Sequence, residues 1–279
     1  MTASRYSPPA NQLFTYGSAL DNLKDWSGYL TLGITTEHIP DLIQLLEDES
    51  LFQTESEDSD AWAVIHAWRT LAELKAEAAI PALIAVLRHW GNEDPWWEWL
   101  GMEFPRVFGA IGTVAIPALT EFVADSSGSD FSRSIAAQCL TAIAEQYPDR
   151  RLQCIEGINQ TLEGLDQNSP ELNADLIDAL IEMKAVESAA LIEQAFQLNC
   201  VDENIAGDWD EVQVNLGLKS REELPRKRFN ITLGEPPERE SYSSLPEFGG
   251  FGGASKKSKT KAKRKQQQES RKKNRGKKK

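Results

Sequence analysis

The chain has 279 residues, of which 41% are hydrophobic and 26% are charged, and its formal net charge at pH 7 is −13. This hydrophobic content excludes a wholly disordered protein, because it can bury a core over most of the chain. Three widely spaced cysteines, Cys139, Cys154 and Cys200, form neither a disulfide framework nor a zinc motif, and they indicate a reducing, cytoplasmic setting.

The charge is divided unequally along the chain. Residues 255–279 hold 14 of the 30 Lys and Arg residues and one of the 43 acidic residues, which gives this segment a charge of +13. Residues 1–254 therefore carry a charge of −26. An acidic body followed by a basic tail predicts that the tail binds polyanions.

The N-terminal residues are polar and contain two prolines, Pro8 and Pro9, without the charged and continuous apolar regions of a signal peptide. We therefore expect a flexible leader at residues 1–13, followed by a short helix at residues 14–26. The longest apolar stretches, such as residues 79–87, are far shorter than the roughly 18 residues needed to cross a bilayer. No membrane span is expected.

A short phrase with an Ile-Pro pair recurs at residues 37–43, 79–84 and 115–120. The pairs begin at residues 39, 80 and 116, so they are 41 and 36 residues apart, a period typical of stacked two-helix repeats. Each proline is expected in the first turn of a helix, where its missing N–H has no helical partner. Apolar residues then recur at intervals of three and four, which indicates one buried face.

The same pattern predicts five helix pairs in chain order. After the helices at residues 14–26 and 39–49, the expected pairs are 61–74 with 80–89, 103–112 with 114–123, 131–146 with 151–162, and 170–183 with 185–198. Ser169 is the expected N-cap before Pro170. Residues 208–217 are expected to cover the last pair, with Asp208 and Glu211 as a capping box. Residues 219–254 are rich in Glu, Pro, Ser and Gly and predict a disordered linker before the basic tail, residues 255–279.

The phrase Ala-Ile-Pro-Ala-Leu follows helices that end in Leu-Ala-Glu-Leu or Gly-Ala-Ile-Gly, and it resembles the HEAT-like repeat of the phycobilisome-lyase type. Residues 14–218 also resemble a bacterial family of uncharacterised HEAT-like proteins, through residues 66–69, 108–112, 184–187 and 207–214. The resemblance implies an all-α fold, an α-solenoid of about five HEAT-like helix pairs, but no established reaction. Some proteins of similar layout end in a zinc-binding cysteine motif, which does not carry over because no cysteine follows Cys200.

Residues 90–102 predict a loop between the second and third pairs that contains Trp96, Trp97 and Trp99. Loops carry many binding residues, and tryptophan is a frequent interface anchor. His66 and Arg69 are expected to be exposed on the helix at residues 61–74 and are further candidates for contact with a protein client. The alternative is that the indoles only fill the core between two pairs.

The basic tail contains no aromatic residue, so charge attraction rather than base stacking is the expected source of its affinity. Its ligand is left open between RNA or the ribosome, another polyanion such as DNA, anionic lipid, and the acidic body of the chain itself. The candidate polyanion-binding residues are Lys256, Lys257, Lys263, Arg264, Lys265, Arg271, Lys272, Lys273 and Arg275.

No catalytic constellation is recognised in the sequence. The histidines, His38, His66 and His89, lie on different predicted helices, so no metal site is expected. The glycine run at residues 248–253 follows no strand and opens no helix, unlike a phosphate-binding loop. We expect no cofactor and predict a non-enzymatic adaptor with an unknown protein client and a tail that contacts RNA, the ribosome or another polyanion. The alternative is an enzyme-associated chaperone or lyase-like repeat protein that acts on a protein client.

Overall fold

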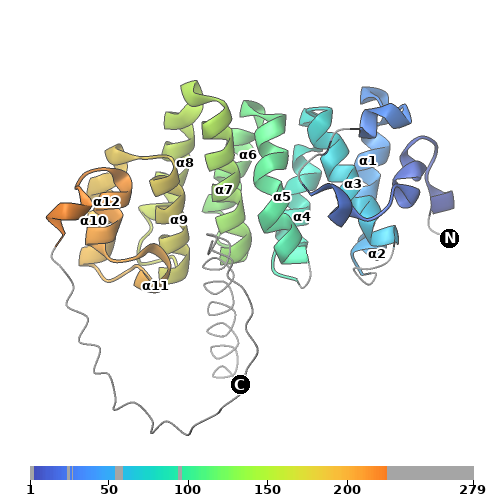
Figure 1. The fold of residues 1–279 in the computed structure, drawn as a ribbon. Helices are drawn as coiled ribbons and strands as arrows, with labels where there is room; N and C mark the ends of the chain where they lie inside the picture. The colour runs from blue at the N-terminus through green and yellow to red at the C-terminus, as the bar shows by residue number, and fades with distance from the viewer. Residues whose placement is uncertain (1–2, 24–25, 27, 54–58, 94–95, 225–279) are drawn as a thin grey trace, which may run out of the picture. The chain divides into compact units, whose positions relative to one another are not determined.

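The computed structural model describes residues 3–23, 26, 28–53, 59–93 and 96–224. Every regular element in these ranges is a helix and none is a strand, which confirms the predicted all-α class. The described residues up to Leu224 belong to one compact unit (Figure 1). Within these ranges no single helix is long and apolar enough to cross a membrane, and only Trp96–Ile111 with Thr113–Ala124, a pair bent by 111°, meets the length and composition together.

The α-helices of this unit vary from one turn to more than four. They are α1 Ile39–Glu47, α2 Glu49–Phe52, α3 Ser59–Glu73, α4 Ile80–Trp90, α5 Trp96–Ile111, α6 Ile116–Ala124, α7 Asp130–Gln146, α8 Arg151–Leu162, α9 Pro170–Glu182, α10 Ala189–Gln197, α11 Glu203–Ala206 and α12 Trp209–Leu216. Short 3-10 turns precede or connect them: η1 Ala3–Arg5, η2 Ala10–Thr15, η3 Ala19–Asn22, η4 Tyr29–Leu32, η5 Thr36–His38, η6 Glu77–Ala79, η7 Thr113–Ala115, η8 Pro148–Arg150, η9 Val186–Ser188 and η10 Arg221–Glu223.

One local structure recurs through the unit. Helices α1, α4, α6, α8 and α10 each begin directly after a 3-10 turn, at residues 39, 80, 116, 151 and 189. In α1, α4 and α6 the first turn contains the proline expected there. The last two turns lack that Ile-Pro pair but keep the same geometry, so the repeat is a property of the backbone and not only of the recurring phrase.

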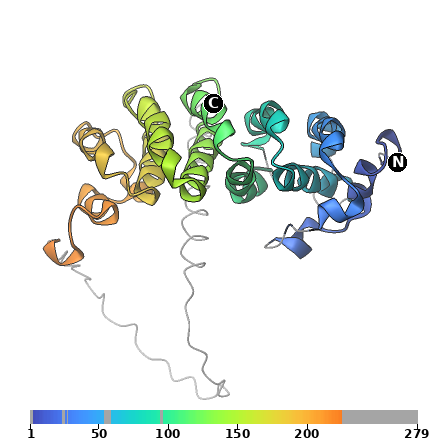
Figure 2. The same ribbon diagram turned by 90° about the horizontal axis from the view of Figure 1, so that it is seen from above.

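The helices lie in two rows, which Figure 2 shows along their axes. In one row α1 contacts α4, α4 contacts α6 and α6 contacts α8; in the other α3, α5, α7 and α9 are successive neighbours. Helix α7 also packs against α6 and α8, so the rows contact each other. The apolar core lies between the rows, and α12 covers the last helices by packing on α9 and α10.

Helices α6 and α8 pack closely together at Gly157. A Cβ atom at this position would lie 2.4 Å from Thr120 Oγ1 and 3.2 Å from Thr120 Cβ. We expect Gly157→Ala to lower the free energy of unfolding by about 1–2 kcal/mol, because overpacking outweighs the better helix propensity of alanine. Urea unfolding measures the change. Gly101→Ala on α5 is the matched control, since its Cβ would meet its nearest neighbour at 3.9 Å; equal effects at the two glycines would contradict the close approach.

The N-terminal prediction is wrong for the described residues. No flexible leader covers residues 3–13 and no α-helix forms at 14–26; the short turns η1 to η3 occupy this segment. Leu13, Phe14 and Tyr29 are buried, and η2, η3 and η4 contact α3. In the described part of residues 3–38 no α-helix covers the outer side of α3, and these irregular turns bury that apolar surface instead.

The predicted tryptophan loop is also wrong in part, because Trp96 begins α5 and the helix continues without interruption to Ile111. The predicted helix at residues 103–112 therefore begins seven residues too late. Pro105 lies inside this helix, although proline is ordinarily tolerated only in the first turn. The cost of one missing hydrogen bond is offset by the buried residues on both sides of it, such as Leu100, Phe104 and Phe108.

At the C-terminal end the expected N-cap at Ser169 is confirmed, and so is one of the two hydrogen bonds of the capping box expected at Asp208. The Ser169 hydroxyl accepts from Leu172 N at 3.0 Å, and the Asp208 carboxylate accepts from Glu211 N at 2.9 Å. The folded unit extends beyond the predicted boundary at 218, because residues 221–223 form η10 and Lys219 pairs with Asp210. The rest of the predicted linker and the basic tail, residues 225–279, lie outside the described residues.

Candidate functional site

A buried ion pair joins α3 to α5. Arg69 on α3 and Glu103 on α5 have side chains that are 0% and 3% exposed. Arg69 donates from Nε to Glu103 Oε2 at 3.0 Å and from Nη2 to Glu103 Oε1, which makes the pair bidentate. The indole Nε1 of Trp68 donates to the same Oε2 at 2.6 Å. Three donors therefore converge on one buried carboxylate.

The ion pair continues into the N-terminal turns through Tyr29 and His66. Arg69 Nη1 donates to the Tyr29 hydroxyl at 3.5 Å, and Arg69 Nη2 donates to the Ala19 carbonyl at 3.1 Å. His66 Nε2 lies 3.0 Å from the Gly17 carbonyl, and its Nδ1 lies 2.8 Å from the Tyr29 hydroxyl. Because a carbonyl can only accept, Nε2 carries the proton and Nδ1 accepts from Tyr29. The directions of all these hydrogen bonds are thereby determined.

The surroundings also determine the charge of each group. Burial lowers the pKa of His66 to about 4, against the opposing effect of its hydrogen bond to Gly17. Burial raises the pKa of Tyr29 to about 12. Burial acts to lower the pKa of Arg69, but the hydrogen bonds and charge of Glu103 outweigh it and place this pKa above its ordinary value. At neutral pH the cluster thus holds a neutral imidazole, a neutral phenol and a guanidinium.

Trp26 lies against this cluster. The Arg106 guanidinium carbon is 3.9 Å from the centre of the Trp26 ring, and the Arg69 carbon is 5.4 Å from it. Both distances suit cation–π attraction. The cluster therefore connects the N-terminal turns, α3 and α5, and its hydrogen-bonding groups are directed at one another instead of at solvent.

The prediction that His66 and Arg69 are exposed is wrong, since both residues are fully buried. The periodicity misled it, because an amphipathic helix was expected and α3 is covered on both sides. A protein partner cannot contact either side chain without opening the core. Their role in this structure is to hold α3, α5 and the N-terminal turns together.

The three tryptophans of the predicted client surface occupy different environments. Trp96 and Trp99 are buried: the Trp96 indole donates to the Phe52 carbonyl at 2.7 Å, and Trp99 packs edge-on against Trp62. For these two the core alternative is correct. Trp97 is half-buried and packs edge-on against Phe131 of α7, with ring centres 5.5 Å apart. Of the five predicted partner-binding residues, Trp97 alone is partly accessible.

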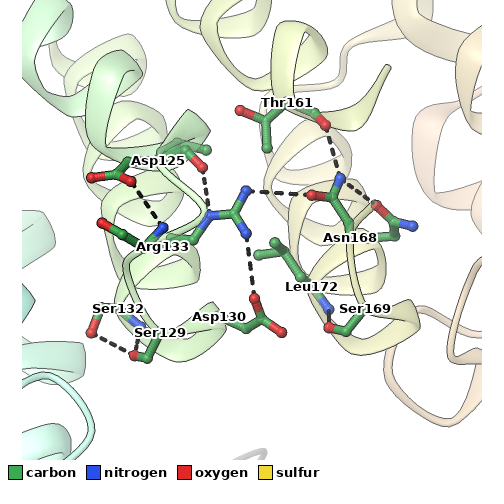
Figure 3. Close-up of polar contacts among 12 residues, drawn as sticks. Asp125, Ser129, Asp130, Ser132, Arg133, Thr161, Asn168, Ser169 and Leu172 are labelled. Carbon is green, nitrogen blue, oxygen red and sulfur yellow. Dashed lines mark hydrogen bonds and ion pairs between the residues drawn. The ribbon is translucent and has the colours of Figure 1, made fainter. Parts of the chain in front are cut away.

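A second polar network connects α6, α7 and α9 (Figure 3). Arg133 on α7 donates to the Val123 carbonyl at 2.8 Å and to Asn168 Oδ1 at 3.3 Å. Asn168 donates to Asn173 Oδ1 at 3.0 Å, and Asn173 on α9 donates to the carbonyls of Leu165 and Cys200 at 3.0 and 2.9 Å. The network satisfies backbone groups where helices end, so its role is structural.

Nucleophilic or metal chemistry finds no support among the described side chains. Cys139 and Cys154 are buried, as predicted, and burial raises the pKa of both thiols, to about 11 for Cys154. A buried thiol of raised pKa is a poor nucleophile. Within the described ranges no three His, Cys, Asp or Glu side chains gather in a way that could hold a metal ion.

Several residues of the two networks were not predicted from the sequence, namely Tyr29, Glu103, Arg133, Asn168 and Asn173. One signal was available: Arg69 stands in a helix of otherwise mostly apolar residues, and a buried guanidinium requires an acid elsewhere in the chain. The nine candidate polyanion-binding residues of the tail lie outside the described residues.

No family model, curated protein or solved structure was found to match this chain.

Proposed function

We propose that this protein is a non-enzymatic scaffold in which a HEAT-like α-solenoid binds a protein client and the basic tail binds RNA, the ribosome or another polyanion. The observation that carries the proposal is the separation of charge, with +13 on residues 255–279 and −26 on residues 1–254. A tail of this charge attracts phosphates, whereas the body repels them.

The arrangement of the helices supports the scaffold part of the proposal. Within each row every helix packs on the helix next to it, so an added pair extends the surface of the row. The hydrogen bonds of the Arg69–Glu103 and Arg133–Asn168 clusters link protein groups to one another. Trp97, half-buried beside Phe131, is the residue at which we place contact with a client.

The basic tail is also attracted to the acidic body of its own chain, and this attraction competes with binding to an external polyanion. Exposed charges further apart than about 8 Å are screened at physiological salt, so such contacts are weak individually. A dense phosphate polymer presents many charges along one strand, and its bound counterions are released on binding. An external polyanion therefore displaces the body from the tail.

The proposal is tested by capture from lysate at two salt concentrations, with and without ribonuclease. The intact chain is compared with a variant in which the nine candidate residues of the tail are all changed to Gln, and with a control whose tail keeps its composition in shuffled order. We expect the intact chain and the shuffled control to capture RNA at low salt and the Gln variant to capture little. Equal capture by all three proteins would reject a role for the tail. If the protein with the shuffled tail fails to capture RNA while the intact chain captures it, binding that depends only on charge is rejected.

The client is tested in the same experiment after ribonuclease treatment. Trp97→Ala is expected to reduce recovery of a stoichiometric protein client while RNA capture by the tail stays the same. If Trp97→Ala and the intact chain recover the same client in the same amount, contact at Trp97 is rejected.

A further inference from the structure

The described residues between 3 and 34 are here called the N-terminal cover. A group of polar contacts joins the cover to α3, in addition to the hydrogen bond from Tyr6 to Asp48. The Gly17 carbonyl accepts from His66, the Ala19 carbonyl accepts from Arg69, and the Tyr29 hydroxyl bonds to both. His66 and Arg69 are one turn apart on α3. The cover itself consists of 3-10 turns without an α-helix in its described residues, and apart from these polar contacts it is held by buried apolar residues such as Leu13 and Phe14.

Only the neutral form of His66 satisfies this arrangement. A second proton would make Nδ1 a donor toward the Tyr29 oxygen, which already accepts from Arg69, and the Tyr29 hydrogen would lose its acceptor. Both ring nitrogens would then be donors in a site built for one of each kind.

The charges around His66 also oppose a second cation. Facing it are Tyr16 and Tyr29 of the cover and Arg69 of α3, with Arg106 and Glu103 of α5 beyond Trp26 and Arg69. The carboxylate of Glu103 is already occupied by Arg69 and Trp68. Among the described residues that face the ring, an imidazolium would therefore be buried beside a guanidinium and find no carboxylate that is not already paired, which is costly.

We propose that the N-terminal cover is an acid-released device: protonation of His66 breaks the hydrogen-bond chain from Gly17 through Tyr29 to Arg69, and the cover separates from α3 while the later helices stay folded. The residues of this device are different from Trp97, the proposed client contact, and from the Lys and Arg residues of the tail. It exposes the outer side of α3, which the cover otherwise buries.

The direction of the pH dependence follows from the two states of His66. Burial lowers its pKa to about 4 in the closed state, whereas a solvated histidine titrates at about 6.5. The open state binds the proton more tightly, so the closed state is fully stable above pH 6.5 and loses stability as the pH falls toward 4. Between pH 7.5 and pH 5 the opening equilibrium is expected to rise about 30-fold.

Hydrogen exchange of the full chain at pH 7.5 and pH 5, corrected for the intrinsic exchange rate, measures this opening. Peptides within residues 10–22 are expected to lose protection by about 30-fold, while peptides from α7 to α9 change little. His66→Gln keeps a donor and an acceptor but cannot be charged, so its cover should stay closed at both pH values. His89→Gln is the matched control, since His89 is exposed on α4 and should keep the full response.

The proposal fails if the cover of the wild-type chain keeps its protection at pH 5, or if His66→Gln opens as the wild type does. It also fails if opening begins only below pH 4. In that case the cover would be released by protonation of carboxylates and not of His66. One such carboxylate is Asp48, which accepts from Tyr6 of the cover at 2.8 Å. If His66→Gln does not fold, an NMR titration of the His66 ring in the wild-type chain replaces it. The pH midpoint of this titration must coincide with the pH midpoint of cover opening. Two different midpoints overturn the proposal.

Discussion

Glu103→Ala is expected to lower the free energy of unfolding by about 3–5 kcal/mol, the largest effect of any single substitution considered for this chain. The reason is that the Arg69 guanidinium, 0% exposed, would remain buried without its bidentate partner. The Trp68 indole N–H would lose its acceptor at the same time. Removing one member of a buried pair costs far more than the pair contributes, because the other charge stays out of water.

Urea unfolding followed by circular dichroism measures this loss, with Glu121→Ala as control. Glu121 is exposed on the neighbouring helix α6, and its replacement is expected to change stability by less than about 0.5 kcal/mol. A Glu103→Ala protein as stable as the Glu121→Ala protein would show that Arg69 reaches water or another acid, contrary to the structure.

Asn173→Ala is expected to lower the free energy of unfolding by about 2–4 kcal/mol. Its amide donates to the carbonyls of Leu165 and Cys200, and its oxygen accepts from Asn168. Alanine leaves these groups without a partner inside the protein, at about 1–3 kcal/mol for each buried group. The substitution therefore weakens the attachment of α9 to the segments that contain Leu165 and Cys200.

A second substitution at the same position identifies which bonds matter. Asn173→Asp keeps the acceptor for Asn168 but places an anion against two carbonyl oxygens, so it should destabilise at least as much as alanine. Asn215→Ala, on the exposed side of α12, is the control and is expected to have little effect. If Asn173→Asp is as stable as the wild type, the two hydrogen bonds donated by Asn173 contribute nothing to stability, contrary to the structure.

The parts of the fold that were predicted correctly depend on neighbours in the sequence. Proline in the first turn, apolar residues at intervals of three and four, and the caps at Ser169 and Asp208 act within a few residues, so the pattern contains them. The all-α class and most helix positions follow from such signals. Pro105 shows their limit, because packing on both sides of α5 outweighs the local preference for a helix start.

The candidate site was predicted poorly because its contacts are distant in sequence. Arg69 and Glu103 are 34 residues apart, and Gly17 and His66 are 49 apart. Periodicity placed His66 and Arg69 on a solvent-facing side, but irregular turns from the N-terminus cover that side. Such turns carry no helical period, so their packing on α3 has no signature that single-sequence reasoning can use.

Polyanion binding by the tail is tested most directly by titrating purified protein with a fluorescent single-stranded RNA at several salt concentrations. The intact chain is compared with the variant in which the nine candidate Lys and Arg residues are Gln. Each phosphate contact contributes about −0.7 to the slope of log K against log salt, so the variant's slope should be shallower by about 6. Its affinity at low salt should fall on the order of 10³-fold. An unchanged slope and affinity would contradict binding by the tail.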